Sequence, residues 1–409
     1  MNESYDIVIV GGGMVGASLA LALAPLPWRI AVVEAFAPSS ESQPSYDDRA
    51  TALAEGSRRI FDTLGVWPEL ARSAAPIRRI HVSDRGRFGF ARLAAGDYGV
   101  DALGHVVENR RLGTVLWDAL ACRPRVDLLA PCRVVAVDAA GEPATVEVEA
   151  ADGETHTLTA GLVVAADGAR SRTREMLGMP VRMDDYGQQA LIANVTVTDG
   201  GTGDEAYERF TDEGPLALLP MTGNRWSLVW TMSPERAALI AEADEPAFLA
   251  ALQDAFGYRL GGFERAGRRQ RYPLQLVAAI EQRLGRVLLI GNAAHGLHPV
   301  AGQGFNLGLR DVAVLADVLA STSEAGGDPG ASATLEAYLD WRREDHERVI
   351  GLTDSLVRLF TNPLAPVRGA RALGLIGLDL IGPAKDLFAR QAMGLQGRLP
   401  RLARGLPLT

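Results

Sequence analysis

The sequence predicts an α/β protein in which a nucleotide-binding βαβ unit is combined with a second, antiparallel sheet and a C-terminal helical segment. Three observations support this fold class. The chain begins with a buried strand, a glycine turn and a helix of small apolar residues. Strand-like runs such as "ALIANVTVTD" and "RWSLVWTM" fill its middle and are separated by Gly, Asp and Asn turns. After residue 340 the pattern is helical and is interrupted by prolines.

Length and composition limit the possible functions. A chain of 409 residues is too long for one ordinary core and indicates two or three structural units. Its net charge of −9 argues against a general nucleic-acid binder. Two cysteines, Cys122 and Cys132, provide neither a disulfide framework nor a metal cluster. The N-terminus has no basic region before its apolar run, so we expect no secretory signal and a cytoplasmic protein.

The N-terminal stretch "YDIVIVGGGMVGASLALALA" contains the motif Gly11-x-Gly13-x-x-Gly16 between a strand and a helix. The first glycine allows the tight turn, the second lets a pyrophosphate approach the backbone, and the third allows close packing of helix and strand. The N–H groups and the dipole at the helix start then favour phosphate. The motif therefore predicts dinucleotide binding.

A second strand, "RIAVVEA", ends at Glu34, which lies 18 residues beyond Gly16. An acidic residue at that place can accept hydrogen bonds from ribose hydroxyls. This completes the βαβ context, but it does not distinguish a nicotinamide dinucleotide from a flavin dinucleotide.

Two later segments bear on that choice. "LVVAADGARSRTREMLG" is a buried strand followed by Asp167 and a basic stretch. "RVLLIGNAAHGLHPVAGQGFNLGLRD" is a strand that reaches Gly291 and Asn292, then a loop rich in Pro and Gly, then a helix that begins near Gly304.

Together, these three motifs resemble the single-component flavoprotein aromatic hydroxylases, which have the p-hydroxybenzoate hydroxylase fold. The resemblance implies a Rossmann-like FAD-binding domain with an inserted antiparallel-sheet substrate domain. It implies that FAD is the bound cofactor. The predicted cofactor-binding residues are Gly11, Gly13, Met14, Val15, Gly16, Glu34, Arg49, Asn109, Asp167, Gly291, Asn292, Pro299, Gly302, Gly304, Phe305 and Asn306.

The resemblance also implies individual roles. Pro299, Gly302, Gln303, Gly304 and Asn306 would line the flavin ring, where small residues let the backbone approach. Arg49 and Asn109 match family positions near the cofactor. Family members usually have Asp where this chain has Asn292, whose amide can still bond a hydroxyl without adding negative charge near phosphate.

Further segments, among them "HVSDRGRFGFARL", "YERFTDEGPLALLPM" and "TDSLVRLF", are similar to the ubiquinone-biosynthesis hydroxylases. That resemblance implies NADPH-dependent insertion of one oxygen atom from O2 into a polyprenylated phenol, with 2-octaprenyl-6-methoxyphenol as the predicted substrate. The alternatives are a sister hydroxylase that acts at another ring carbon, and a non-catalytic FAD-binding assembly subunit. A geranylgeranyl-type reductase or a halogenase shares the FAD domain, but the Trp-x-Trp-x-Ile segment of the halogenases is absent.

The predicted domain organisation is discontinuous. We assign residues 1–75, 106–180 and 275–340 to the FAD-binding domain, 76–105 and 181–274 to the substrate domain, and 341–409 to the C-terminal helical segment. No second Gly-x-Gly-x-x-Gly follows a strand, which favours transient docking of NAD(P)H over a dedicated nicotinamide domain.

No residue is predicted to be catalytic. His295 and His298 are close to the flavin loop in sequence, but loop packing is favoured over a role as base. Tyr186, Tyr207 and Trp230 could line a substrate cavity, although core aromatics of a sheet explain them equally well.

The C-terminal tail has its own charge pattern. Residues 356–409 contain eight basic residues and only Asp379 and Asp386 as acids. This basic, apolar segment predicts either contact with a membrane surface or with other ubiquinone-biosynthesis proteins, or helices that close over the FAD domain with solvated arginines.

Overall fold

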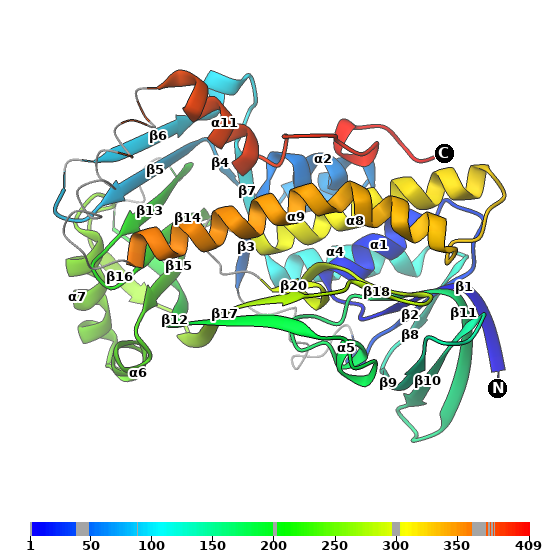
Figure 1. Cartoon of the computed structure of the whole chain (residues 1–409). Coiled ribbons are helices and arrows are strands. Elements are labelled where there is room, and N and C mark those ends of the chain that lie inside the picture. The colour runs from blue at the N-terminus through cyan, green and yellow to red at the C-terminus, as the bar shows by residue number, and fades with distance from the viewer. Residues whose placement is uncertain are drawn as a thin grey trace.

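The computed structural model describes residues 2–37, 49–87, 89–198, 203–296, 303–361 and 381–409, together with 374, 377 and 379. It contains three sheets and confirms the mixed α/β class. Figure 1 shows the two larger sheets at opposite ends of the molecule, with long helices lying across both.

The first sheet has eight strands and a parallel centre. The order β18-β19-β11-β1-β2-β8 is parallel from β19 to β8, and β9 and β10 extend it as antiparallel strands next to β11. Its strands are β1 (Asn2–Val10), β2 (Ile30–Val33), β8 (Val126–Leu129), β9 (Cys132–Asp138), β10 (Ala144–Ala150), β11 (Thr155–Ala165), β18 (Arg283–Leu284) and β19 (Val287–Leu289).

Helices pack against this sheet because their apolar faces match its apolar strands. Isoleucine and valine side chains of β1, β2 and β11 form one core with α1 and α8, and Leu335 and Tyr338 of α9 join it. The helices near this sheet are α1 (Met14–Leu23), α2 (Glu55–Thr63), α3 (Trp67–Ala71), α4 (Asn109–Ala121), α5 (Arg172–Met176), α8 (Gln303–Glu324) and α9 (Ser332–Thr361). In Figure 1, α8 and α9 run side by side across the centre of the molecule.

The second sheet has nine strands, in the order β20-β17-β12-β15-β14-β13-β5-β6, with β16 beside β12. Helices α6 (Pro234–Glu242) and α7 (Glu245–Phe256) cover one face, where Trp226, Trp230 and Phe256 are buried. The strands are β5 (Arg79–Asp84), β6 (Phe90–Ala94), β12 (Val181–Val197), β13 (Glu205–Phe210), β14 (Pro215–Met221), β15 (Arg225–Met232), β16 (Phe263–Ala266), β17 (Gln270–Ala279) and β20 (His295–Gly296).

This sheet is antiparallel as expected, with one exception. Strand β5 pairs with β13 in parallel, so that Arg79 lies opposite Glu205 and Asp84 lies opposite Phe210. The parallel pair joins two segments far apart in the chain, which is why no hairpin signal predicted it. The proposed domain boundaries remain a prediction.

A third sheet has three strands in the order β3-β7-β4. It contacts β14 of the nine-stranded sheet and the helices α2, α4 and α8 that lie near the eight-stranded sheet. Its strands are β3 (Ala50–Ala54), β4 (Ala75–Ile77) and β7 (Gly104–Glu108). Ile77 and Val106 of this sheet pack with Ala206 and Met221 of the nine-stranded sheet. This apolar contact joins the three-stranded sheet to the nine-stranded sheet.

The C-terminal residues pack on two parts of the fold, first on the nine-stranded sheet and then on the helices of the eight-stranded sheet. Helix α11 (Gly382–Ala392) packs beside β6 and the short helix η1 (Ala95–Tyr98), where Ala389 and Met393 are buried with Leu93. The last residues, including η4 (Leu402–Arg404), lie on the core of α1 and α8, and Arg401 pairs with Asp317 at 2.6 Å. For Arg401, the prediction of closure over the nucleotide-binding unit therefore describes the geometry better than a membrane-facing role.

Candidate functional site

Four predicted site residues stand directly after parallel strands of the eight-stranded sheet. Gly11 follows β1, Glu34 follows β2, and Asp167 and Gly291 come just after β11 and β19. The register aligns the strand ends, because Val10 pairs with both Val33 and Ala165, and Ala165 pairs with Leu289. The residues therefore meet at one edge of the sheet, the edge where open α/β folds bind ligands.

The glycine turn leaves no space for side chains. Gly11 has a φ of +99°, and a Cβ there would lie 2.8 Å from the backbone of Ala166. A Cβ on Gly16 would lie 1.9 Å from the carbonyl oxygen of Gly11. Gly13, which precedes α1, offers no side-chain cap to the first N–H groups of the helix. The turn and the open helix start fit a pyrophosphate group.

Glu34 and Trp117 hold this turn in place. The N–H of Gly12 donates to Glu34 Oε2 at 2.7 Å, and the N–H of Phe36 donates to Glu34 Oε1 at 3.0 Å. From α4, Trp117 Nε1 donates to the carbonyl oxygen of Gly12 at 2.8 Å. No motif in the sequence distinguishes Trp117 from an ordinary core aromatic, so its contact with the turn is not predicted from the sequence.

Asp167 lies next to the glycine turn. Its Oδ2 accepts hydrogen bonds from the backbone N–H and the Oγ1 of Thr173, both at 3.0 Å. Its Oδ1 is buried and has no hydrogen-bond partner among the described residues. A buried carboxylate oxygen without a donor costs free energy, so this atom is suited to a donor from a bound molecule.

Gly291 brings the start of α8 close to the start of α1. It has a φ of +56°, and a Cβ there would lie 3.1 Å from the Val15 side chain. A Cβ on Gly308 would also lie 3.1 Å from Val15 and 3.2 Å from the Cα of Gly291. Val15 therefore fills the contact between the two glycines, while the neighbouring Met14 is half-buried.

A second group of predicted residues gathers around β3. Asn306 Oδ1 accepts hydrogen bonds from the N–H of Ala54 at 2.8 Å and from Ser57 Oγ at 2.7 Å, and its Nδ2 donates to the carbonyl oxygen of Ala52. Asn109 Oδ1 accepts from Thr51 Oγ1 at 2.7 Å. The start of α8 is thus tied to β3, and β3 is tied to the start of α4.

The other predicted residues differ in their surroundings. The guanidinium carbon of Arg49, which directly precedes β3, lies 4.9 Å from the centre of the ring of Tyr272 in β17, a cation–π contact. Asn292 is exposed, a Cβ on Gly304 would meet open space, and Phe305 stacks on Phe61. Pro299 and Gly302 lie outside the described residues, as does His298.

The three aromatic residues that could line a substrate cavity also differ in their surroundings. Tyr207 and Trp230 are buried in the core beneath α6 and α7, which agrees with the core interpretation of these residues. The hydroxyl of Tyr186 donates instead to Asp354 of α9 at 3.1 Å.

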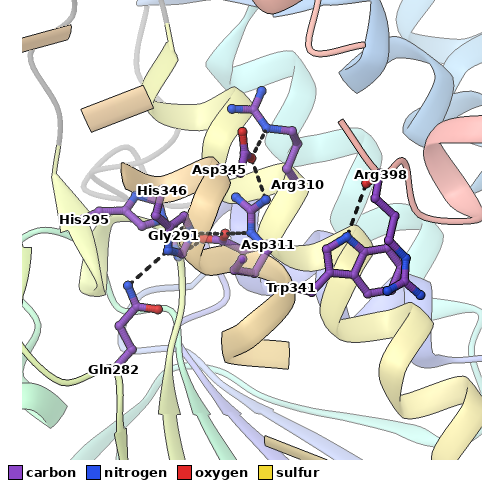
Figure 2. A network of polar contacts seen from close by, with 10 residues as sticks. Gln282, Gly291, His295, Arg310, Asp311, Trp341, Asp345, His346 and Arg398 are labelled. Atoms are coloured by element: carbon purple, nitrogen blue, oxygen red, sulfur yellow. Dashed lines mark hydrogen bonds and ion pairs between the residues drawn. The ribbon is translucent and has the colours of Figure 1, made fainter. Parts of the chain in front are cut away.

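Asp311 of α8 forms the centre of a buried polar cluster that the sequence did not reveal. Its Oδ2 accepts from the N–H of Gly291 at 3.0 Å and from His295 Nε2 at 2.6 Å. Its Oδ1 accepts from Arg342 Nε at 2.8 Å and His346 Nε2 at 2.7 Å, both on α9. Figure 2 shows these side chains converging on the carboxylate from three elements. Asp311 thereby links the segment after β19 to both long helices.

The charges in this cluster are matched. Burial disfavours a charge on Asp311, but His295, His346 and Arg342 hold the pKa of its carboxyl well below the usual range. Burial lowers the pKa of His346, and its Nδ1 lies 3.2 Å from Gln282 Nε2, within hydrogen-bond distance of the amide. Asp345 extends the network, with Arg342 Nη1 at 2.6 Å and Arg310 Nε at 2.9 Å.

His295, Asp311 and His346 are a combination of residues that can bind a metal. Here, however, the two imidazole Nε2 atoms point at different oxygens of the same carboxylate, and the Arg342 guanidinium occupies a further position. A cation between them would face a fixed positive charge. We therefore interpret the cluster as a carboxylate held by donors.

The comparisons with known proteins agree with this fold. The chain matches the family model described as "FAD binding domain" over residues 4–352. Among solved structures, the p-nitrophenol 4-monooxygenase PnpA of Pseudomonas putida superposes with a TM-score of 0.79, at 21% identity, over 97% of this chain and 99% of that one. The likeness in structure concerns the fold, and together with the family match it defines an FAD-dependent aromatic monooxygenase.

Two relatives narrow the class. The ubiquinone hydroxylase UbiL of Rhodospirillum rubrum is 43% identical, over 100% of this chain and 94% of its own length. The 3-demethoxyubiquinol 3-hydroxylase of Escherichia coli is 34% identical, over 96% of this chain and 100% of its own. The chain belongs to the family of ubiquinone-biosynthesis hydroxylases within the FAD-binding monooxygenases.

Proposed function

We propose that this protein uses NADPH and O2 to hydroxylate a polyprenylated phenol on the route to ubiquinone, with 2-octaprenyl-6-methoxyphenol as its substrate. The full-length similarity to UbiL carries this proposal, because it extends through the nine-stranded sheet as well as the cofactor unit. NADPH as the reductant follows from the family resemblance.

The residues at the edge of the eight-stranded sheet would hold FAD. The glycine turn and the start of α1 would bind the pyrophosphate, Glu34 a ribose hydroxyl, and exposed Asn292 the ribityl chain. Glu34 now accepts from the N–H of Gly12, so this carboxylate would bind ribose and fix the turn together. Bound FAD would supply the chemistry of reduction by NADPH and of oxygen transfer from O2.

The chain's own task is to position the phenol and to exclude water. Ile77, Val106, Ala206 and Met221 form a buried apolar cluster where the three-stranded sheet meets the nine-stranded sheet, and we propose that it helps to keep water from the phenol. Exclusion of water from such a site prevents the wasteful release of reactive oxygen species.

A sister activity is the second candidate. The name of the Escherichia coli relative indicates hydroxylation at position 3 of a demethoxyubiquinol, whereas the name of UbiL specifies no ring position. Both candidate activities have a polyprenylated phenol as the substrate, and they differ in the ring carbon that is hydroxylated. The non-catalytic assembly subunit is disfavoured, since both relatives are hydroxylases by name.

The partners and the location are proposals too. Among the described residues, no helix combines the length and hydropathy required to cross a bilayer. We keep peripheral membrane contact as a proposal for α11, whose Leu387 is 57% exposed and is preceded by Ile381 at 56%.

The test is a steady-state assay of the purified protein. We expect a flavin absorbance spectrum, and NADPH oxidation that rises when a short-prenyl 2-methoxyphenol is added. Assays with the corresponding demethoxyubiquinol would separate the two candidates by the hydroxylated product. A protein that binds FAD but oxidises NADPH equally with and without either phenol would contradict both.

A further inference from the structure

A pocket lies on the nine-stranded sheet, whereas the glycine turn follows a strand of the eight-stranded sheet. It has a volume of about 350 Å³ and is lined by residues of β5, β6, the hairpin between them, β13 and the segment after α7: His81, Ser83, Asp84, Gly86, Arg87, Gly89, Phe90, Arg92, Arg209 and Arg259. Four arginines therefore line it together with one aspartate.

The strand register explains why these side chains converge. Arg209 lies opposite Ser83, and Ser83 lies opposite Phe90. Two pairs further on, and therefore on the same face of the sheet, His81 lies opposite Arg92. Directly paired residues project from the same face of a sheet, so this row of positions builds one surface. Arg259 reaches it from the end of α7, which packs on the same face through the contact of Phe256 with Tyr207.

The positive charge in this pocket is only partly balanced. Asp84 lies 3.8 Å from Arg87 Nε, and Arg92 Nε donates to His81 Nδ1 at 3.3 Å. Burial, with a further contribution from Arg259, Arg92 and Arg209, lowers the pKa of His81 to about 4 against the opposing effect of Asp379, so this ring is neutral and accepts. Within the described part of the chain, the buried Nε of Arg209 has no hydrogen-bond partner.

Burial and the neighbouring Arg85 and Arg259 also lower the pKa of Arg209. The guanidinium groups thus repel one another, and a buried N–H lacks an acceptor. An anion with several oxygens would relieve both, because phosphate accepts charge-assisted hydrogen bonds from arginine in a forked geometry. A carboxylate could serve one arginine, but a tetrahedral phosphate can serve several at once.

We propose that this pocket binds a phosphate group, through Arg87, Arg209 and Arg259, with Ser83 as a further donor. The site is separate from the glycine turn that would hold the pyrophosphate of FAD. Two sources offer this chemistry: the headgroup of an anionic phospholipid, or a soluble phosphate such as that of a nucleotide. Phe90, which lines the pocket, is 40% exposed, and Tyr258, next to Arg259, is 80% exposed, as a lipid headgroup site would require.

The first arm of the test uses sodium pyrophosphate against sodium chloride of equal ionic strength. A ligand that binds the folded state raises the midpoint of thermal unfolding. We expect pyrophosphate to raise it for the wild-type FAD-loaded protein, and not for the double variant Arg87→Gln/Arg259→Gln. The matched control is Arg265→Gln/Arg268→Gln, which removes two exposed arginines near β16 and should respond like the wild type.

The second arm distinguishes the sources. If the phosphate belongs to a lipid, the fraction of protein that sediments with vesicles of phosphatidylglycerol and phosphatidylcholine should be about tenfold lower for the pocket variant, Arg87→Gln/Arg259→Gln, than for the control variant. Affinity for NADPH should fall instead if it belongs to a nucleotide. Either result supports a phosphate site, and unchanged FAD content shows that the variant is folded.

Equal responses of the pocket variant and the control variant to pyrophosphate, vesicles and NADPH would overturn the proposal. The single variant Arg87→Gln, in the hairpin between β5 and β6, is the fallback if the double variant does not fold. It should show a partial loss in the same assay, and no loss would count equally against the site.

Discussion

His295 Nε2 lies 2.6 Å from Asp311 Oδ2, and both side chains are fully buried. The same oxygen accepts the N–H of Gly291, one residue before Asn292. The carboxylate on α8 thus fixes both ends of the short segment 291–295, which contains Gly291 and Asn292, the two residues that the family resemblance assigns to FAD contact. The position of Gly291 and Asn292 therefore depends on the carboxylate of Asp311.

The first prediction concerns Asp311. In Asp311→Asn, buried Arg342 keeps Asp345 but loses the carboxylate that pairs with its Nε, and breaking a buried ion pair costs about 3–5 kcal/mol. We expect a decrease of that order in the unfolding free energy, measured by urea denaturation. Asp340→Asn is the control, because its ion pair with Arg343 is exposed and such pairs contribute at most about 1 kcal/mol. Equal effects of the two substitutions would refute the central role of Asp311.

The second prediction concerns the glycine turn. Gly16→Ala places a methyl group 1.9 Å from the carbonyl oxygen of Gly11, so the turn must move. We expect FAD to bind at least about tenfold more weakly, which corresponds to about 1.4 kcal/mol. Flavin fluorescence during titration of apoprotein measures it. In Gly96→Ala the new methyl group meets open space, and this variant should bind FAD like the wild type. A Gly16→Ala protein with normal affinity would mean that the turn does not hold the cofactor.

The third prediction concerns Asn292, the residue that departs from the family pattern. Since it is exposed, neither Asn292→Ala nor Asn292→Asp should change the unfolding free energy by more than about 0.5 kcal/mol. If the amide bonds a ribityl hydroxyl, the alanine variant should lose about 1 kcal/mol of FAD binding. The aspartate variant can accept the same bond and should retain most of the affinity. Calorimetric titration with FAD checks this, and equal loss in both variants would argue against a hydroxyl contact.

The fourth prediction concerns pH and His105 of β7. Burial lowers the pKa of His105 to about 4, with Arg58 contributing, while an unfolded histidine titrates near 6.5. Below about pH 6.5 the unfolded chain therefore binds a proton that the folded chain does not. Stability from this group is complete above pH 6.5 and is lost as the pH falls towards about 4.

Denaturation curves across that window measure the effect. His105→Gln should flatten the decrease in the unfolding free energy, and His81, whose pKa burial also lowers to about 4, accounts for part of the remainder. His156→Gln is the control, since this side chain is partly exposed at the surface. A wild-type stability that stays constant between pH 6.5 and 4 would be inconsistent with buried neutral histidines.

The sequence predicted the parts of the fold that local pattern determines. The βαβ unit and its glycine turn follow from a buried strand, a motif and a small-residue helix, and the strand before Gly291 was found within one residue. The parallel pairing of β5 with β13 could not be predicted, because no local signal relates residues 79–84 to 205–210.

The same limit applies to the candidate site. His295 and Asp311 are separated by 16 residues, and Asp311 and His346 by 35, so only packing of α8 on α9 joins them. Residue type suggested loop packing for His295, and its actual partner is a buried carboxylate. Asn306, expected at the flavin ring, has its amide bonded to β3 and α2, so the bonds of this side chain depend on tertiary packing that periodicity does not encode.

One measurement tests the central claim most directly: the reaction of the FAD-loaded protein with NADPH, isotopically heavy O2 and a short-prenyl 2-methoxyphenol, followed by mass spectrometry of the product. The account predicts one heavy oxygen atom in a new ring hydroxyl, with NADPH consumed in proportion. A product that carries oxygen from water, or NADPH oxidation without a hydroxylated phenol, would contradict it.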